Sequence, residues 1–465
     1  MCIRDSLKDV GLQESELEAI LNGFAAPQLS EPSPMVIIDL KGDAALFQTV
    51  KAEAEARGQT FLFFTPEKDR STHRFNPFYD FDSKSRSDAQ LCQLFLDALS
   101  LNHGAGYGSG YFSLRSRTLL YRALQDTTSG GGPPRSFPEL WEVLERFGEE
   151  MGSTDDYRDA FELVGTIQAL AKCKALTDDP NIPAISMPTV IEQGQVVYFW
   201  LPAAIESVTA QEIGKLAVYS LLSAAIDRQR RQSELPAEQR SPRQVYLVID
   251  EFQRLAGDNF RIILEQARSF GIAAILSNQS IADLQTRETD LRPTVRTNTR
   301  VKMFFSVTDP AEAETLSALS GEEVVEERTR TVSYNLAESR FLPQSRSESL
   351  RDTRKPRLSV GDIQAYSDHP NDFILHVSRG SGYTQFAGLP VPVRTAWPLP
   401  FALYQGRSAE PWPTIEGGVG IINEQHLKVV EKEQRAETER HQQETLKRIL
   451  KKRTPGKVDP GPASA

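Results

Sequence analysis

The chain has 465 residues, of which 39% are hydrophobic and 25% charged, a composition typical of a globular protein with two to four domains or one elaborated core. Its 63 acidic and 53 basic residues give a net charge of −10. This charge argues against a protein that coats nucleic acid with its whole surface, but not against a basic channel in an acidic body. No apolar run approaches about 18 residues, so we expect no membrane-spanning segment in this chain. The three cysteines, Cys2, Cys92 and Cys173, lack CxxC spacing and favour a reducing compartment.

A strand–helix–strand unit is predicted near the start of the chain. Met35–Asp39 is a short apolar strand, Ala44–Arg57 has helical spacing and Thr60–Thr65 is a second buried strand. Such a unit predicts a parallel sheet. Lys41 and Asp43 are expected to shape the turn between the first strand and the helix, with a contact to nucleotide or DNA as the alternative. Asn76 is expected to form a turn before Pro77.

The next hundred residues, about 81–180, predict an all-α block. Helical spacing recurs in four segments, Asp88–Leu101, Ser113–Leu124, Phe137–Glu150 and Asp155–Leu176. We expect this block to be an insertion that divides the core into residues 24–80 and 181–400. Residues 1–23 then form an N-terminal remnant and 401–465 a tail.

The second half of the chain returns to alternating strands and helices. Strands are predicted at Gln195–Leu201, Val245–Ile249, Ile272–Leu276 and Val301–Val307, and helices at Thr209–Arg230 and Phe260–Phe270. Thr209 and Glu212 have the spacing of a capping box. The pattern predicts an α/β fold with a doubly wound, mostly parallel sheet.

Two segments outside this core are rich in charge. Glu326–Arg357 lacks apolar rhythm and predicts an exposed hairpin or a mobile loop, with a DNA- or partner-facing element as the alternative. Glu424–Arg453 predicts one exposed helix. That helix is either a solvated face or a tail that binds a partner or nucleic acid.

The strongest chemical signal is Val245–Phe252, VYLVIDEF, an apolar strand followed by two carboxylates. Parallel sheets bind their ligands at the carboxyl ends of the strands, so the segment has the form of a Walker B element. Asp250 would hold Mg²⁺, and Glu251 would orient and deprotonate a water molecule. The structural alternative is an acidic pair that only favours a helix N-terminus.

Two further residues flank the next predicted strand. Gln279 follows it, where an amide can bond both a γ-phosphate and the attacking water, although a loop-capping role is equally compatible. Arg268 precedes it, at the end of a helix. It either caps that helix or reaches a neighbouring subunit's nucleotide as an arginine finger.

These segments together resemble the type IV secretion and conjugation coupling ATPases, the TraD/TraG-like branch of the FtsK/HerA P-loop DNA translocases. The resemblance rests on VIIDLKGD (Val36–Asp43), FNPF (Phe75–Phe78), VIDEFQRL (Val248–Leu255) and ARSFGIAAILSNQS (Ala267–Ser280). The segment Asn298–Glu322 and the helix with TAQEIGKL (Thr209–Leu216) also fit. The order matches over about residues 35–400.

The resemblance implies a RecA-like core and assigns Walker B acids to Asp250 and Glu251, a sensor amide to Gln279 and a trans-acting arginine to Arg268. It implies ATP and Mg²⁺ as cofactors and a hexameric ring with DNA in its channel. The partners would be DNA, single- or double-stranded and bound without sequence specificity, a relaxase or relaxosome, and secretion-channel proteins. The location would be the cytoplasmic face of a bacterial inner membrane.

Two N-terminal elements of the family are missing, the transmembrane helices and the phosphate-binding loop that follows them. The sequence contains no GxxxxGK[ST] loop, whose amides and lysine hold phosphates. Val10–Leu21 stands where it belongs, with Ser15 at the position of the Mg²⁺-binding hydroxyl and Glu14 at that of the lysine. The unpatterned start, Met1–Ser6, favours a truncated reading frame, with an ATP-binding-defective relative as the alternative.

We therefore expect an ATP-driven coupling protein that delivers DNA or nucleoprotein to a secretion channel. Two alternatives stay open: a related DNA-handling motor outside secretion, and a non-catalytic adaptor that recruits substrates.

Overall fold

The structure is a computed structural model that describes most of the chain between residues 32 and 415. The described residues are 32–81, 87–101, 109–127, 132–152, 154–177, 182–203, 207–236, 239, 243–285, 289–334, 343–369, 371–378, 388–395 and 400–415. Ser15, the segment Val10–Leu21 and the predicted helix Glu424–Arg453 therefore lie outside the described residues.

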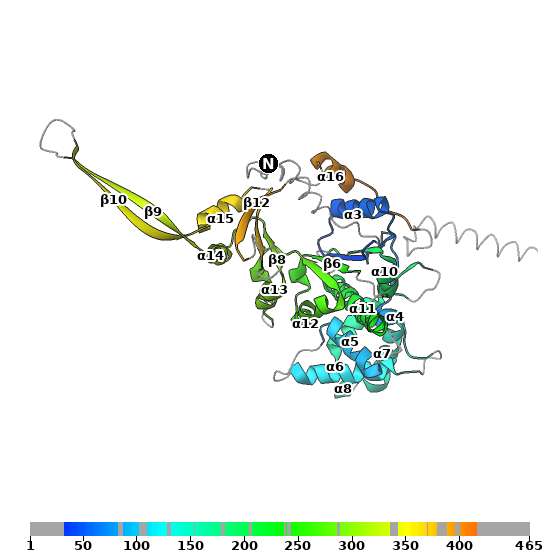
Figure 1. Cartoon of the computed structure of the whole chain (residues 1–465). Helices are drawn as coiled ribbons and strands as arrows, with labels where there is room; N and C mark the ends of the chain where they lie inside the picture. The colour runs from blue at the N-terminus through cyan, green and yellow to red at the C-terminus, as the bar shows by residue number, and fades with distance from the viewer. Residues whose placement is uncertain are drawn as a thin grey trace, which may run out of the picture.

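A five-stranded parallel sheet forms the centre of the molecule (Figure 1). Its order is β2-β5-β1-β6-β7, with β1 at Met35–Asp39, β2 at Phe61–Phe64, β5 at Val196–Trp200, β6 at Val245–Asp250 and β7 at Ile272–Leu276. All four pairings are parallel. The predicted α/β class with a parallel sheet is confirmed.

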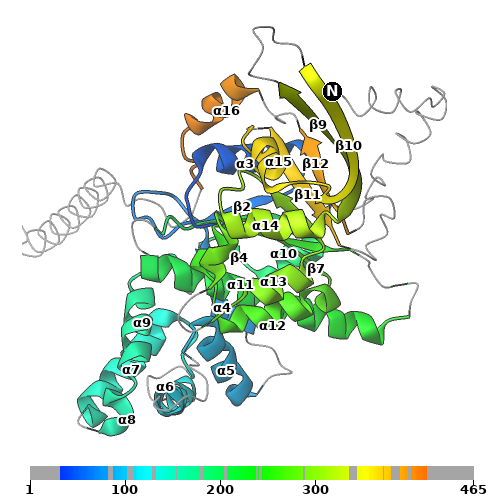
Figure 2. The same ribbon diagram turned by 90° about the vertical axis from the view of Figure 1, so that its left-hand side faces the viewer.

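Helices cover both faces of this sheet, as a doubly wound fold requires. Helix α3 (Ala44–Ala56) and helix α11 (Ser207–Glu234) lie on opposite sides of the strands in both views (Figures 1 and 2). In β1 the side chains alternate accordingly. Ile37 joins an aromatic cluster with Phe47 of α3, whereas Val36 and Ile38 join the larger core on the other face.

The first strand–helix turn and the FNPF turn have local causes. Asp43 is the N-cap of α3, and its Oδ1 accepts hydrogen bonds from the amides of Ala45 and Leu46 at 2.9 and 3.1 Å. Asn76 Oδ1 accepts from the Phe78 amide at 3.1 Å, at the start of α4 (Pro77–Phe81). The predicted turn roles of Asp43 and Asn76 are confirmed.

The predicted helical block consists of five helices at the lower end of the molecule in Figure 1. They are α5 (Asp88–Ala98), α6 (Ser109–Leu124), α7 (Phe137–Met151), α8 (Asp155–Arg158) and α9 (Phe161–Ala171). The single helix expected over Asp155–Leu176 is broken between α8 and α9, and it ends at Ala171. The apolar core of the block is continuous with that of the sheet, so the division at 81–180 stays a prediction.

The capping box expected at Thr209 is wrong. Helix α11 begins at Ser207, which places Thr209 inside the first turn. Glu212 instead pairs with Lys215, one turn further along the helix, at 3.0 Å. Before α11, helix α10 (Met187–Gln193) follows a short strand β4 (Ala184–Ile185) that pairs with β3 (Arg74–Phe75).

The strand expected at Val301–Val307 does not join the parallel sheet. It forms β8 (Val301–Phe304), which pairs antiparallel with β11 (Asp372–Val377), and β11 pairs in turn with β12 (Pro390–Arg394). This second sheet packs with α14 (Pro310–Leu319) and α15 (Val360–Ser367) around a small core of its own. The partner strand lies about seventy residues downstream, so local periodicity gave no sign of it.

The charged segment after α14 forms a long two-stranded hairpin. Strands β9 (Glu322–Tyr334) and β10 (Pro343–Pro356) pair antiparallel and project away from the body (Figure 1). The hairpin expected at Glu326–Arg357 is confirmed.

The remaining helices complete the two faces. Helices α12 (Asp258–Gln266) and α13 (Arg292–Asn298) flank the β6–β7 end, and α16 (Phe401–Ser408) packs on α3. None of the helices in the described ranges is both long and apolar enough to cross a membrane.

Candidate functional site

The candidate site lies at the carboxyl ends of the central strands. Asp39, the last residue of β1, is the register partner of Asp250, the last residue of β6. The Asp250 carboxylate accepts a hydrogen bond from the hydroxyl of Ser277, which follows β7. Asp250 is half-buried. Three neighbouring strands thus bring polar side chains to one edge of the sheet, as the sequence pattern predicted.

Glu251 occupies a strained position directly after β6. Its backbone has φ 56° and ψ 46°, the left-handed region that side chains other than glycine adopt rarely. Its side chain is buried and accepts hydrogen bonds from the amides of Gln253 at 2.6 Å and Gln279 at 3.1 Å. Arg254 Nε lies 3.7 Å from the same carboxylate. A strained residue held by this many partners is typical of a functional position.

Gln279 is brought to Glu251, whereas Arg268 is not. Gln279 follows the carboxyl end of β7, next to the end of β6. Arg268 lies exposed in the 3-10 turn η3 (Ala267–Phe270), which precedes β7 and therefore lies at the other end of that strand. Five residues of strand span about 15 Å, so Arg268 belongs to the opposite edge of the sheet.

Asp39 is a buried residue of this edge that the sequence analysis did not single out. Its carboxylate accepts from the backbone amides of Lys41, Gly42 and Asp43 at 2.9, 2.7 and 2.9 Å, and from the Tyr198 hydroxyl at 2.6 Å. Burial and the Asp39 carboxylate raise the pKa of Tyr198. The signal available in the sequence was the acid at the end of an apolar strand with a glycine three residues later.

This turn places three amides around one anion, as in a phosphate-binding loop, but the anion is the chain's own carboxylate. Gly42 has φ +82°, and a Cβ there would meet the Trp200 ring at 3.2 Å, so the turn needs glycine. Because Asp39 takes these amides, the DLKGD turn does not offer them to a nucleotide.

The oxygen groups at Asp250 fit a magnesium ion. Mg²⁺ prefers oxygen ligands and usually binds one or two carboxylates, with water and phosphate oxygens filling the other positions. The Asp250 carboxylate and the Ser277 hydroxyl supply such oxygens at the strand ends. Within the described residues no group of three or more His, Cys, Asp or Glu side chains forms a complete metal site.

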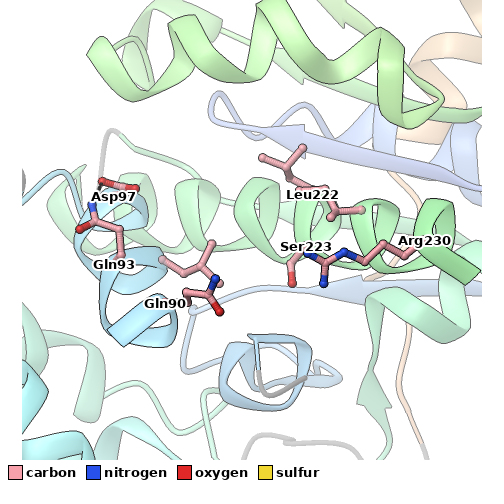
Figure 3. Close-up of a pocket in the computed structure, with 8 residues that line it drawn as sticks. Gln90, Gln93, Asp97, Leu222, Ser223 and Arg230 are labelled. Atoms are coloured by element: carbon pink, nitrogen blue, oxygen red, sulfur yellow. Dashed lines mark hydrogen bonds between the residues drawn. The ribbon is translucent and has the colours of Figure 1, made fainter. Parts of the chain in front are cut away.

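A pocket of about 260 Å³ lies elsewhere, between α5 and α11 (Figure 3). Leu94, Leu222 and Ile226 line its apolar part, with Asp97 near one end and Arg230 near the other. It is separate from the strand ends that carry Asp250 and Glu251.

Comparison with protein families finds one matching domain. Residues 244–367 match the family described as the TraM recognition site of TraD and TraG. This stretch includes β6, β7, Asp250, Glu251, Arg268 and Gln279, and it continues through the projecting hairpin.

Individual proteins give weaker similarities. The type 4 coupling protein DotL of Legionella pneumophila is 24% identical over 159 residues, which are 32% of this chain and 20% of DotL. This chain thus matches about a fifth of the length of that curated relative.

Two solved structures are also similar. The bacterial conjugative coupling protein TrwBdeltaN70 is 16% identical, with 83% of this chain and 92% of that chain covered at a TM-score of 0.49. VirB4 of Thermoanaerobacter pseudethanolicus is 13% identical, with 62% and 73% covered at a TM-score of 0.40. The fold assignment itself rests on the strand order described above.

Proposed function

We propose that this chain is the nucleotide-hydrolysing core of a type IV coupling protein. The match of residues 244–367 to a TraD/TraG domain confirms the predicted resemblance to these proteins. The protein would deliver DNA or nucleoprotein to a secretion channel. The observation that carries the proposal is the hydrogen bond between Gln279 and Glu251, beside Asp250 at the carboxyl edge of a parallel sheet.

Each residue of this edge has a distinct task in ATP hydrolysis. Asp250 and the Ser277 hydroxyl would hold Mg²⁺, which would neutralise charge on the phosphates. Glu251 accepts a proton from the attacking water, and the Gln279 amide fixes the orientation of the Glu251 carboxylate. Ser15 is proposed as a further hydroxyl ligand from its place in the sequence alone.

Arg268 acts on a neighbouring subunit in this proposal. Its place at the far edge of the sheet keeps it from its own Glu251, and its side chain is exposed, so a second copy would have access to it. A planar guanidinium from the neighbour would stabilise charge on the transferred phosphate. The assembly would be a homo-oligomer, a hexameric ring with a basic bore, that binds DNA without reading its sequence.

The partners and the location follow from the same proposal. Relaxosome proteins would bring the substrate, and a secretion channel would receive it. The motor would work at the cytoplasmic face of a bacterial inner membrane.

The test is ATP hydrolysis by the full-length protein in the presence of DNA. Glu251→Gln removes the proton acceptor but keeps the side-chain shape, so we expect turnover to fall by at least about 100-fold while ATP still binds. Glu265→Gln, an exposed residue of α12, is the matched control and should leave turnover unchanged. Undiminished turnover of Glu251→Gln would refute the assignment.

A second candidate function is that of a substrate-recruiting adaptor without catalysis. The observation that favours it is that Asp39 engages the amides of the DLKGD turn, so this turn does not offer them to a nucleotide. The adaptor predicts that the 465-residue chain binds a relaxase or effector without measurable ATP affinity. Micromolar binding of Mg·ATP in calorimetry would exclude it.

A further inference from the structure

The hairpin β9–β10, which we call the arm, projects from the body and is mostly exposed over its described side chains (Figure 1). Its strands of 13 and 14 residues reach about 40 Å at the usual rise per residue. A two-stranded hairpin is marginally stable on its own in water. The arm projects away from the body in Figure 1, so a surface of another molecule is needed to cover it.

The charges of the arm favour a protein partner over a nucleic acid. Its two strands contain six acidic and six basic residues, so the arm carries no net charge. Several of these charges pair across the strands, as in Arg328–Glu348 at 3.1 Å and Lys355–Glu327 at 2.5 Å. An element that grips phosphates needs an excess of cations, which the arm lacks.

One face of the arm carries two exposed apolar side chains. Val324 is 65% and Leu350 is 64% exposed. Leu350 is the register partner of Arg328, and residues four apart on a strand share a face, so Val324 and Leu350 lie on the same face. The cross-strand pairs that contain Val324 and Leu350 lie four residues, or about 13 Å, apart along the arm.

A matching apolar row runs along the outer face of β8. Val301 and Met303 of β8 and Phe305, which directly follows the strand, alternate along the chain and are 50%, 57% and 56% exposed. The Phe305 ring packs at its other side on that of Phe373, with ring centroids 4.9 Å apart. Val301 and Phe305 are also four residues, or about 13 Å, apart. The strand is an edge strand of its sheet, so nothing in the described chain pairs with its other side.

The charges around the two surfaces are complementary. Residues 289–305 contain four basic residues, Arg292, Arg296, Arg300 and Lys302, and one acidic residue, Asp290. Arg292 pairs with Asp290 at 2.8 Å and Lys302 alternates onto the other face of β8, so the exposed cations of this stretch are Arg296 and Arg300. The half of the arm nearest the body, residues 322–327 and 351–356, contains five carboxylates and three cations. Opposite charges at a contact favour encounter and fix its register.

We propose that the arm of one copy lies along β8 of a second copy, with Val324 and Leu350 on the row Val301–Met303–Phe305. The arm points away from its own β8, so the contact joins different molecules (Figure 1). Because one surface is the arm and the other is β8, the contact is head-to-tail and propagates from copy to copy into a ring or a filament. The inference rests on the proposed homo-oligomer and names the surfaces that build it.

Disulfide trapping between two differently marked copies tests the contact. In the full chain with Cys2, Cys92 and Cys173 changed to serine, one copy carries Leu350→Cys and the other carries Met303→Cys. Mild oxidation of the mixture should give a dimer band of mixed composition, identified by tags of different mass, and neither copy alone should give it. The matched control is Ser349→Cys, whose side chain lies next to Leu350 on the opposite face of the arm and should cross-link at least about tenfold less.

Each outcome decides the proposal. Equal cross-linking of Ser349→Cys, absence of any mixed dimer, or dimers of Leu350→Cys alone would each overturn it, the last by showing that arms pair with arms. Leu350→Asp should weaken self-association at least about tenfold in sedimentation, with an unchanged circular dichroism spectrum. ATP turnover is measured separately through Glu251, so failure of the arm contact and failure of the proposed hydrolysis are distinguishable.

Discussion

The backbone of Glu251 is strained, which lowers the stability of the fold but places the carboxylate in the candidate site. Its left-handed backbone costs free energy, and the bonds from Gln253 and Gln279 hold the carboxylate in place despite that cost. A residue with this geometry at the end of a Walker B strand is expected to be optimised for the reaction and not for folding.

The strain at Glu251 is measurable by comparing glycine with alanine. Both substitutions remove the carboxylate, but only glycine adopts φ 56° without a steric cost. We expect Glu251→Gly to be more stable than Glu251→Ala by about 1 kcal/mol in urea unfolding, although both lose hydrolysis. Equal stability of the two variants would show that the position is not strained.

The buried carboxyl group of Asp80, which lies away from the candidate site, makes the stability of the protein depend on pH. It lies buried in α4, where its Oδ1 accepts from the Met187 amide at 3.2 Å. Burial raises the pKa of Asp80 to about 8. The neutral carboxyl is thus the form that the folded chain prefers.

The raised pKa of Asp80 predicts that stability falls as pH rises. Its contribution is complete below the unfolded pKa near 4 and is lost progressively as pH approaches 8, because the unfolded chain ionises first. Asp80→Asn stays neutral, so its advantage over the wild type should grow between pH 5 and pH 8. Denaturant unfolding of both proteins between pH 5 and pH 8 checks this prediction. Parallel curves of unfolding free energy against pH would contradict it.

At the scale of elements, the turn between β1 and α3 depends on Asp39. Three amides and one hydroxyl donate to this single carboxylate, and the same turn ends at the N-cap of α3. The turn therefore fixes the helix that covers one face of the sheet.

Removal of the Asp39 carboxylate should be costly. Asp39→Ala leaves three backbone amides and the buried Tyr198 hydroxyl without their acceptor, and we expect a loss of about 3 kcal/mol in the free energy of unfolding. Tyr198→Phe removes one of these bonds and should cost about 1 kcal/mol. A loss below 1 kcal/mol for Asp39→Ala would show that water replaces the carboxylate.

At the scale of the whole molecule, Arg268 and Glu251 lie at opposite edges of one sheet and would meet only between copies. This arrangement predicts complementation between two inactive variants of the whole gene product. Arg268→Ala and Glu251→Gln should each lose ATP hydrolysis. A random equal mixture should regain about a quarter of wild-type turnover, because that share of interfaces combines an intact Glu251 with an intact neighbouring Arg268. No recovery on mixing would argue against a trans role for Arg268.

The amino-acid sequence by itself determined the central strands, the helical block and the edge at which Asp250, Glu251 and Gln279 meet. These features follow from local patterns: apolar runs form strands, and the carboxyl ends of parallel strands share one edge. The tertiary structure alone decided that β8 leaves the parallel sheet and that the Tyr198 hydroxyl donates to the Asp39 carboxylate. Each of these depends on which distant segment packs alongside, because β11 lies about seventy residues after β8 and Tyr198 lies 159 residues after Asp39.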